Sequence, residues 1–330
     1  MTPLLSVENL KTYFHTYRGL VKAVDGISFS INEKEIIGLV GESGCGKSVS
    51  MLSILQLISS PPGEIVGGRA MFEGQDLLQY KPKSDAMSSI RGAKIAMIFQ
   101  EPMTSLNPVL TIGRQLTESM EIHLNMTHQA AEGRAIELLQ LVGIPDAKNR
   151  LNAYPHQFSG GMRQRVMIAI ALSCHPRILI ADEPTTAVDV TTQAQLLELM
   201  QDMVDRFNTA LIIVTHNLGV VARYARRIYV MYSGHIVESG LADDIFLNPQ
   251  HPYTAGLLEC IPHLGETRQD KKLAPIRGLP PNLINMPSKC AFLPRCDYVR
   301  DVCRQKSWPS LEPVGVQHYV ACYRKIKDKS

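Results

Sequence analysis

The sequence lacks any apolar run long enough to cross a membrane. Its most apolar stretches, at residues 166–171 and 211–214, are far shorter than the ~18 to 20 residues that a spanning helix needs. The first ten residues include Glu8 and lack the basic and apolar regions of a secretory signal. We therefore expect a cytoplasmic protein that reaches a membrane only through a partner.

The sequence also lacks a strong excess of either charge. Its 34 basic and 31 acidic residues give a formal net charge of +3, and the basic end of the chain is most simply a solvated tail. A nucleic-acid-binding protein typically carries a clustered basic stripe. We therefore expect no nucleic-acid partner.

A disulfide framework is not expected, because seven cysteines in 330 residues without an export signal are typical of reduced thiols or metal ligands. Cys45, Cys174 and Cys260 are interpreted as packing residues. The other four lie near the C-terminus: Cys290, Cys296, Cys303 and Cys322.

The overall composition, 45% hydrophobic and 20% charged, predicts a compact globular fold. Apolar runs typical of strands alternate with helical stretches, which predicts an α/β protein with a mainly parallel core sheet. These runs span residues 36–40, 95–99, 178–181 and 211–214. Residues 5–10 and 26–31 instead alternate polar and apolar positions, which predicts an antiparallel side sheet.

Helical spacing at residues 111–123 and 127–142, the second ending at Gly143, predicts a helical subdomain at about 103–172. From residue 262 prolines recur without a clear strand or helix period. We therefore predict a main domain at 1–261 and a C-terminal extension at 262–330.

One glycine-rich segment fits the phosphate-binding pattern G-x-x-x-x-G-K-[S/T]. It lies between the apolar run 36–40 and a helical run that starts at Val49, the context that the pattern requires. Its residues are Gly41, Glu42, Ser43, Gly44, Cys45, Gly46, Lys47 and Ser48. Glycines let backbone amides approach phosphates, and the helix start adds positive potential. We expect Lys47 to reach the β- and γ-phosphates and Ser48 to bind Mg²⁺.

Two adjacent acids, Asp182 and Glu183, follow the apolar run 178–181. By themselves they are equally compatible with the start of a turn. Phosphoryl transfer requires a metal-holding acid beside the phosphate cradle, so the glycine-rich segment favours a functional interpretation. Asp182 is then expected to hold Mg²⁺ through water, and Glu183 to polarise the attacking water.

A third segment places Ser159, Gly160 and Gly161 at the start of an apolar helix. Such a start exposes backbone N–H groups to an anion. Considered alone, the segment is better explained as a capped helix.

Together with Gln100, Asp189 and His216, these motifs make residues 1–240 similar to the nucleotide-binding subunit of ABC transporters. The resemblance implies an ATPase that uses ATP and Mg²⁺, with Ser159 to Gly161 in the signature motif. It implies that Gln100 touches Mg²⁺ and water, that Asp189 belongs to the D-loop, and that His216 contacts the γ-phosphate. The catalytic residues would be Lys47, Gln100, Glu183 and His216.

Two further features depend on the same resemblance. Tyr13 matches the aromatic residue that stacks on adenine. Phe158 and Met162 depart from the usual L-S-G-G-Q signature, but the serine and both glycines are kept.

The segments 248–254 and 287–296 resemble the C-terminal extension of dipeptide, oligopeptide and nickel importers, and the chain looks closest to the dipeptide permease ATPase. The resemblance implies several partners: a second, non-identical ATPase subunit, two integral membrane permease subunits and an extracytoplasmic solute-binding protein. The chain would then lie peripherally at the cytoplasmic face of the inner membrane. The cargo stays open, because other subunits select it.

The spacing of Cys290, Cys296, Cys303 and Cys322 matches no zinc ribbon or short ferredoxin pattern. A metal staple suits a segment too small to build its own core, and unliganded thiols are the alternative. Resemblance to dipeptide permease subunits implies a [4Fe-4S] cluster, with Zn²⁺ as the alternative metal.

Overall fold

The computed structural model describes the whole chain except residues 1, 101–104, 185–189, 261–275, 287 and 325–330, and only the backbone of residues 190–192. The chain divides into two compact units. Unit 1 comprises residues 1–31, 36–79 and 214–330, and unit 2 comprises residues 32–35 and 80–213. The domain boundary expected at residue 262 lies outside the described residues and stays a prediction.

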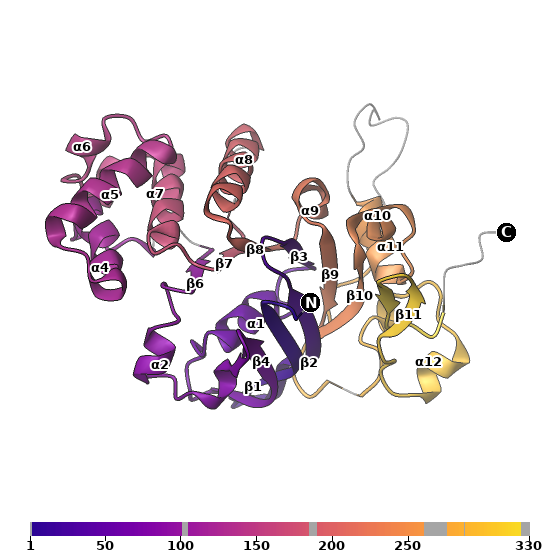
Figure 1. The fold of residues 1–330 in the computed structure, drawn as a ribbon. Coiled ribbons are helices and arrows are strands. Elements are labelled where there is room, and N and C mark those ends of the chain that lie inside the picture. The colour runs from indigo at the N-terminus through magenta and orange to yellow at the C-terminus, as the bar shows by residue number, and fades with distance from the viewer. Residues whose placement is uncertain (1, 101–104, 185–189, 261–275, 287, 325–330) are drawn as a thin grey trace. The chain divides into compact units, whose positions relative to one another are not determined.

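Unit 1 combines the N-terminal strands, the first helix and the C-terminal part of the chain (Figure 1). Its elements are β1 (Leu5–Thr16), β2 (Gly19–Ile31), β3 (Ile36–Val40), α1 (Lys47–Ile54), β4 (Gly63–Phe72), β5 (Gln75–Asp76), η1 (Leu77–Gln79), α9 (Leu218–Tyr224), β9 (Arg227–Tyr232), β10 (His235–Leu241), α10 (Ala242–Leu247), α11 (Pro252–Glu259), η3 (Leu293–Arg295), α12 (Asp301–Gln305), β11 (Glu312–Gly315) and β12 (His318–Val320).

The predicted antiparallel side sheet is confirmed. Its strand order is β2-β1-β4-β5, and β1 pairs antiparallel with both β2 and β4. Leu5, Val7 and Leu10 of β1 are all buried. The apolar positions of this alternating pattern therefore form part of the core of unit 1.

The strands of the second sheet that belong to unit 1 have the order β11-β12-β10-β9-β3. Every residue of β3 is buried, and β3 runs parallel to β9. The strands β11 and β12 were not expected, because the sequence from residue 262 shows no clear period. They are only four and three residues long, which is too short to display an alternation of polar and apolar residues. Strand β12 pairs antiparallel with β10, and Val320 lies opposite Glu238.

Unit 2 holds the helical subdomain and three strands with the order β8-β7-β6, of which β6 and β7 are parallel. Its elements are α2 (Asp85–Ser88), β6 (Ile95–Ile98), α4 (Ile112–Leu124), α5 (His128–Leu141), α6 (Ala147–Arg150), η2 (Pro155–Gln157), α7 (Gly160–Leu172), β7 (Ile178–Asp182), α8 (Val190–Phe207) and β8 (Ala210–Thr215), which ends just beyond the unit. None of the described helices is both long and apolar enough to span a bilayer.

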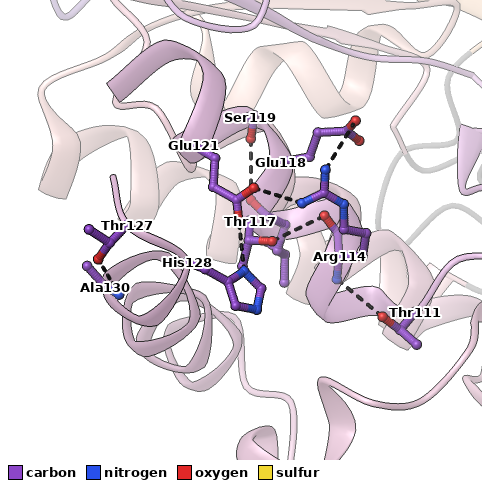
Figure 2. Close-up of polar contacts among 10 residues, drawn as sticks. Thr111, Arg114, Thr117, Glu118, Ser119, Glu121, Thr127, His128 and Ala130 are labelled. Atoms are coloured by element: carbon purple, nitrogen blue, oxygen red, sulfur yellow. Dashed lines mark hydrogen bonds and ion pairs between the residues drawn. The ribbon is translucent and has the colours of Figure 1, made fainter. Parts of the chain in front are cut away.

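The expected helices of the subdomain form, and polar contacts join α4 to α5 (Figure 2). The hydroxyls of Thr111 and Thr127 accept from the first-turn amides of α4 and α5. Glu121 of α4 accepts from Arg114 Nη1 and lies 2.7 Å from His128 Nδ1 of α5. The hydrogen bond with His128, and then that with Arg114, lowers the pKa of Glu121.

Candidate active site

The glycine-rich segment 41–48 forms a tight turn between β3 and α1 in unit 1. A Cβ on Gly41 would lie 2.1 Å from the carbonyl oxygen of Met231, and a Cβ on Gly46 would lie 2.1 Å from that of Ala23. Gly46 also has a φ of 105°, which side-chain-bearing residues rarely adopt. Glycine is therefore required at both positions, and the loop packs closely against the rest of unit 1.

Lys47 lies inside this loop. Its side chain is buried, and Nζ donates to the carbonyl oxygens of Gly41 at 2.7 Å and Glu42 at 3.0 Å. Gly46 offers α1 no side-chain cap, and the first turn of α1 holds no acidic residue. The positive end of the helix dipole and a buried ammonium group thus lie together, as a site for a phosphate requires.

The two acids in unit 2 are held at the end of β7. Asp182 and Glu183 are buried, with exposed fractions of 4% and 8%, and Glu183 adopts a φ of 47°. The exposed Gln100, just after β6, donates from Nε2 to Glu183 Oε2 at 3.1 Å. The parallel pairing of β6 and β7 thus brings together two residues that are 83 positions apart.

The start of α7 is exposed and carries its own cap. Ser159 Oγ accepts from the amide of Met162 at 3.3 Å, and a Cβ on Gly160 would meet nothing within 4 Å. Phe158 is buried, and its carbonyl accepts from Arg163 Nε. Phe158, which replaces the leucine of the usual signature, therefore still buries an apolar side chain next to the start of α7.

Two single residues of unit 1 complete the described candidates. The hydroxyl of Tyr13 donates to Asp25 Oδ1 at 2.6 Å, and burial, followed by this hydrogen bond, raises the pKa of Tyr13 to about 12. Its ring is half-buried, with Lys22 Nζ 5.4 Å from the centroid. His216 is exposed directly after β8.

Comparisons with known proteins support this set of motifs. Residues 24–186 match the ABC transporter family, and residues 237–303 match the C-terminal region of oligopeptide/dipeptide transporters. The chain is 53% identical to the oligopeptide transport ATP-binding protein AppD of Bacillus subtilis, over 92% of this chain and 91% of that protein. It is 48% identical to the dipeptide transport ATP-binding protein DppD of the same organism, over 98% of this chain and 95% of that protein.

The chain belongs to the ATP-binding subunits of oligopeptide/dipeptide ABC transporters. A solved dimeric ATP-binding cassette, MJ0796 bound to ADP and Pi, is similar with a TM-score of 0.64 and 25% identity, over 72% of this chain and 98% of that one. The predicted ABC-type α/β fold and the assignment as an ABC ATPase are thereby confirmed.

Within this ABC subunit the candidate residues fall into two sets. Unit 1 carries the phosphate loop, Tyr13 and His216, while unit 2 carries Gln100, the Asp182–Glu183 pair and the start of α7. Asp189 lies outside the described residues. The role of each residue in ATP hydrolysis stays a prediction.

The C-terminal cysteines of the ABC subunit line one pocket in unit 1. Cys290, Cys296, Cys303 and Cys322 all face it, together with Phe292 and other apolar side chains. Burial is the first cause that raises the pKa of the Cys290 and Cys322 thiols to about 11, and neighbouring thiols add to it. In the part of the chain that the structure describes, no three His, Cys, Asp or Glu side chains are grouped as a single metal ion requires.

Sequence reasoning missed two contacts between the C-terminal part of the chain and the phosphate loop. Arg295 donates from Nη1 and Nη2 to the two carboxylate oxygens of Glu42, at 2.6 and 2.9 Å. Tyr253 accepts through its hydroxyl from the amide of Glu42 at 2.8 Å. The pairs are 253 and 211 positions apart, so no local pattern signals them.

Proposed function

We propose that this chain hydrolyses ATP at the cytoplasmic face of the inner membrane to energise the import of peptides. The buried ammonium group of Lys47, inside a glycine-rich loop at the start of α1, is the observation that carries the nucleotide part. The match of residues 237–303 to the oligopeptide/dipeptide transporter C-terminal region supports the peptide part.

In this proposal Lys47 holds the β- and γ-phosphates. Ser48 and Asp182 are expected to hold Mg²⁺, since hydroxyl and carboxylate oxygens are the ligands that this cation prefers. The cation, when bound, neutralises charge on the phosphate oxygens. Catalysis then depends on positioning and electrostatics rather than on covalent chemistry.

Gln100 and Glu183 are proposed to order the attacking water. The amide of Gln100 fixes one oxygen of the Glu183 carboxylate, which orients that carboxylate at the end of β7. Glu183 accepts the proton of the water, and His216 contacts the γ-phosphate. Tyr13 is proposed to stack on adenine from the edge of the nucleotide site.

The start of α7 is proposed to act on a nucleotide held by a second, non-identical ATPase subunit. The exposed Ser159 and Gly160 and the half-buried Gly161 suit this role because they lie at the start of a helix, where backbone amides can bind an anion of another chain. Two permease subunits and a solute-binding protein complete the proposed importer. The isolated chain should therefore hydrolyse ATP slowly.

Peptides are proposed as the cargo without a preference for length. The sequence favours dipeptides, yet the relatives named for oligopeptide transport, AppD and OppD at 53% and 49% identity, are at least as similar as the dipeptide relative DppD at 48%. Nickel or antimicrobial peptides are alternatives. Purification with ribosomes or DNA, rather than with membrane subunits, would favour the rival class of nucleic-acid-acting ABC ATPases.

The proposed role of Glu183 is tested by Glu183→Gln in the assembled complex. This variant keeps the side-chain shape but loses the proton acceptor, so ATP binding should persist while turnover falls by about 10² to 10⁴-fold. When the two ATPase subunits are purified without the permease subunits, size-exclusion chromatography with ATP should show them trapped as a closed pair. The exposed Glu312→Gln serves as the control, and rapid turnover by Glu183→Gln would remove Glu183 from this role.

We also propose that the four C-terminal cysteines hold a [4Fe-4S] cluster. Soft thiolates suit iron–sulfur ligation, and all four thiols face one pocket. A single Zn²⁺ with Zn–S bonds of about 2.3 Å would need the sulfurs more tightly grouped, and the described residues show no such grouping. The cluster would supply folding energy to the extension.

Metal and sulfide analysis after anaerobic purification tests this cluster. Iron and acid-labile sulfide with a broad visible absorption band are expected, and Cys296→Ser should lower both. Cys174→Ser, a buried cysteine of unit 2, is the matched control. Zinc alone, or four free thiols by titration, would overturn the proposal.

A further inference from the structure

Glu42, the second residue of the phosphate loop, is held at two points by the C-terminal part of the chain. Its amide donates to the hydroxyl of Tyr253, and its two carboxylate oxygens each accept a hydrogen bond from one Nη atom of Arg295. The side chains of Arg295 and Glu42 are 5% and 24% exposed. Such a bidentate pair fixes direction as well as distance.

The guanidinium of Arg295 is itself locked in place. Its Nε donates to the carbonyl of Arg277 at 2.9 Å, and Nη1 also lies 3.3 Å from the hydroxyl of Tyr232. The guanidinium carbon is 5.9 Å from the ring centroids of both Tyr232 and Phe292. Arg295 therefore brings a preorganised charge to the loop.

The contact reaches the lysine of the loop through one residue. Lys47 Nζ donates to the carbonyl of Glu42, the residue whose carboxylate Arg295 grips. A shift of Glu42 would thus move an acceptor of the ammonium group. An unpaired Glu42 carboxylate would also place a negative charge in the loop that receives a triphosphate, and like charges repel most where water is scarce.

We infer that Arg295 is a positioning residue for the phosphate loop, which acts through Glu42 chiefly by neutralising its carboxylate beside the bound triphosphate, with a smaller contribution from fixing the backbone that holds Lys47. This inference rests on the proposed nucleotide-binding role of the loop. It gives the C-terminal extension a function beyond holding a metal: it sets the affinity of the loop for ATP.

A double-mutant cycle in the full-length chain tests the inference, with the Kd for Mg-ATP as the readout. Arg295→Met leaves the Glu42 carboxylate unpaired, and we expect the Kd to rise about tenfold, which is 1.4 kcal/mol. Glu42→Gln should lower the Kd below that of the wild type, because the loop loses its negative charge while the Arg295 cation stays. The double variant should recover most of the loss, because the repelling charge is gone.

A merely structural role for Arg295 predicts the opposite for the double variant, since it would bind as poorly as Arg295→Met or worse. That result overturns the inference. Arg295→Lys keeps the charge with fewer donors and should restore part of the affinity. In the assembled complex, Arg295→Met should raise the KM for ATP more than it lowers kcat.

Arg277→Met is the matched control, because this arginine of the same segment has a side chain that is 86% exposed. It should leave the Kd unchanged. If Arg295→Met does not fold, Arg295→Lys and its combination with Glu42→Gln complete the cycle, and an unrelieved loss in that combination overturns the inference. Wild-type protein that fails to bind Mg-ATP would instead reject the proposed function itself.

Discussion

Helix α1 of unit 1 and helix α7 of unit 2 both begin at glycine-rich segments, yet their N-termini are satisfied in different ways. The start of α1 has a glycine cap without a side chain, and a buried lysine folds back onto the carbonyls of the loop. The start of α7 has a serine that caps the first turn, and a Cβ on Gly160 would meet nothing within 4 Å. The start of α1 is thus matched to an anion by a lysine of its own loop, while the serine of α7 caps only one of the first amides of that helix.

This difference indicates a division of labour between the two segments. The α1 loop packs against the carbonyls of Met231 and Ala23 and is bound by Arg295, so its backbone is held in place for a ligand. The α7 start needs no ligand to be stable. It is therefore suited to contact a phosphate that another subunit presents.

The largest expected difference between the two helix starts appears when a methyl group is added to a glycine at each of them. Gly46→Ala forces a positive φ on alanine and a clash with the carbonyl of Ala23, so we expect strain of about 1 to 3 kcal/mol or more and a loss of nucleotide affinity of over about a hundredfold. Thermal unfolding measures the loss of stability, and isothermal titration calorimetry with Mg-ATP measures the loss of affinity.

Gly160→Ala provides the matched change at α7. Its Cβ meets nothing within 4 Å, so folding and ATP affinity of the isolated chain should stay unchanged. If both alanine variants bound ATP normally, the closed and open helix starts would not differ as described.

A smaller effect is expected from removing the cation beside each glycine segment. Lys47→Met should weaken Mg-ATP binding roughly 10- to 150-fold, the range of a lost charge-assisted hydrogen bond. Arg163→Met at α7 removes a donor to the carbonyl of Phe158 and leaves the phosphate loop of the same chain unchanged, so ATP affinity of the isolated chain should be unaffected. Unaltered binding by Lys47→Met in fluorescence titration would contradict the proposed phosphate grip.

Removing the serine cap of α7 should lower the free energy of unfolding by about 1 kcal/mol. Ser159→Ala should also lower turnover of the assembled complex while leaving the ATP affinity of the isolated chain intact. Thr127→Ala removes the equivalent cap of α5, whose hydroxyl accepts from Ala130, at a similar cost in stability. Equal loss of turnover in both variants would mean that Ser159 acts only as a cap.

The sequence predicts those parts of this comparison that depend on local pattern. The strands β3 and β7, the loop 41–48 and the helix α5 follow from apolar runs, glycine positions and caps, and they lie where expected. Lys47 follows from a contiguous motif, and Glu183 follows because phosphoryl transfer at that motif requires an acidic pair such as Asp182–Glu183.

Contacts between distant segments could not be predicted in the same way. The pairing of β12 with β10 and the grip of Arg295 on Glu42 join residues on the order of 80 to 250 positions apart, where no periodicity or motif links them. Arg295 appears in the sequence only as a basic residue beside Cys296.

The smallest expected effect is a difference in thiol reactivity between the two helix starts. Burial raises the pKa of Cys45, which has an exposed fraction of 5%, so its thiol should stay protonated at neutral pH and react slowly with iodoacetamide. A cysteine introduced at the open start of α7 by Gly160→Cys should react at the rate of an exposed thiol. Mass spectrometry of peptides, at several times after addition of the reagent, separates both sites from the C-terminal thiols.

Because reaction requires the thiolate, raising the pH should speed alkylation at position 160 before it affects Cys45. Equal rates at the two positions would show that the phosphate loop is as open as the start of α7, and the contrast between the two helix starts would then lose its physical basis.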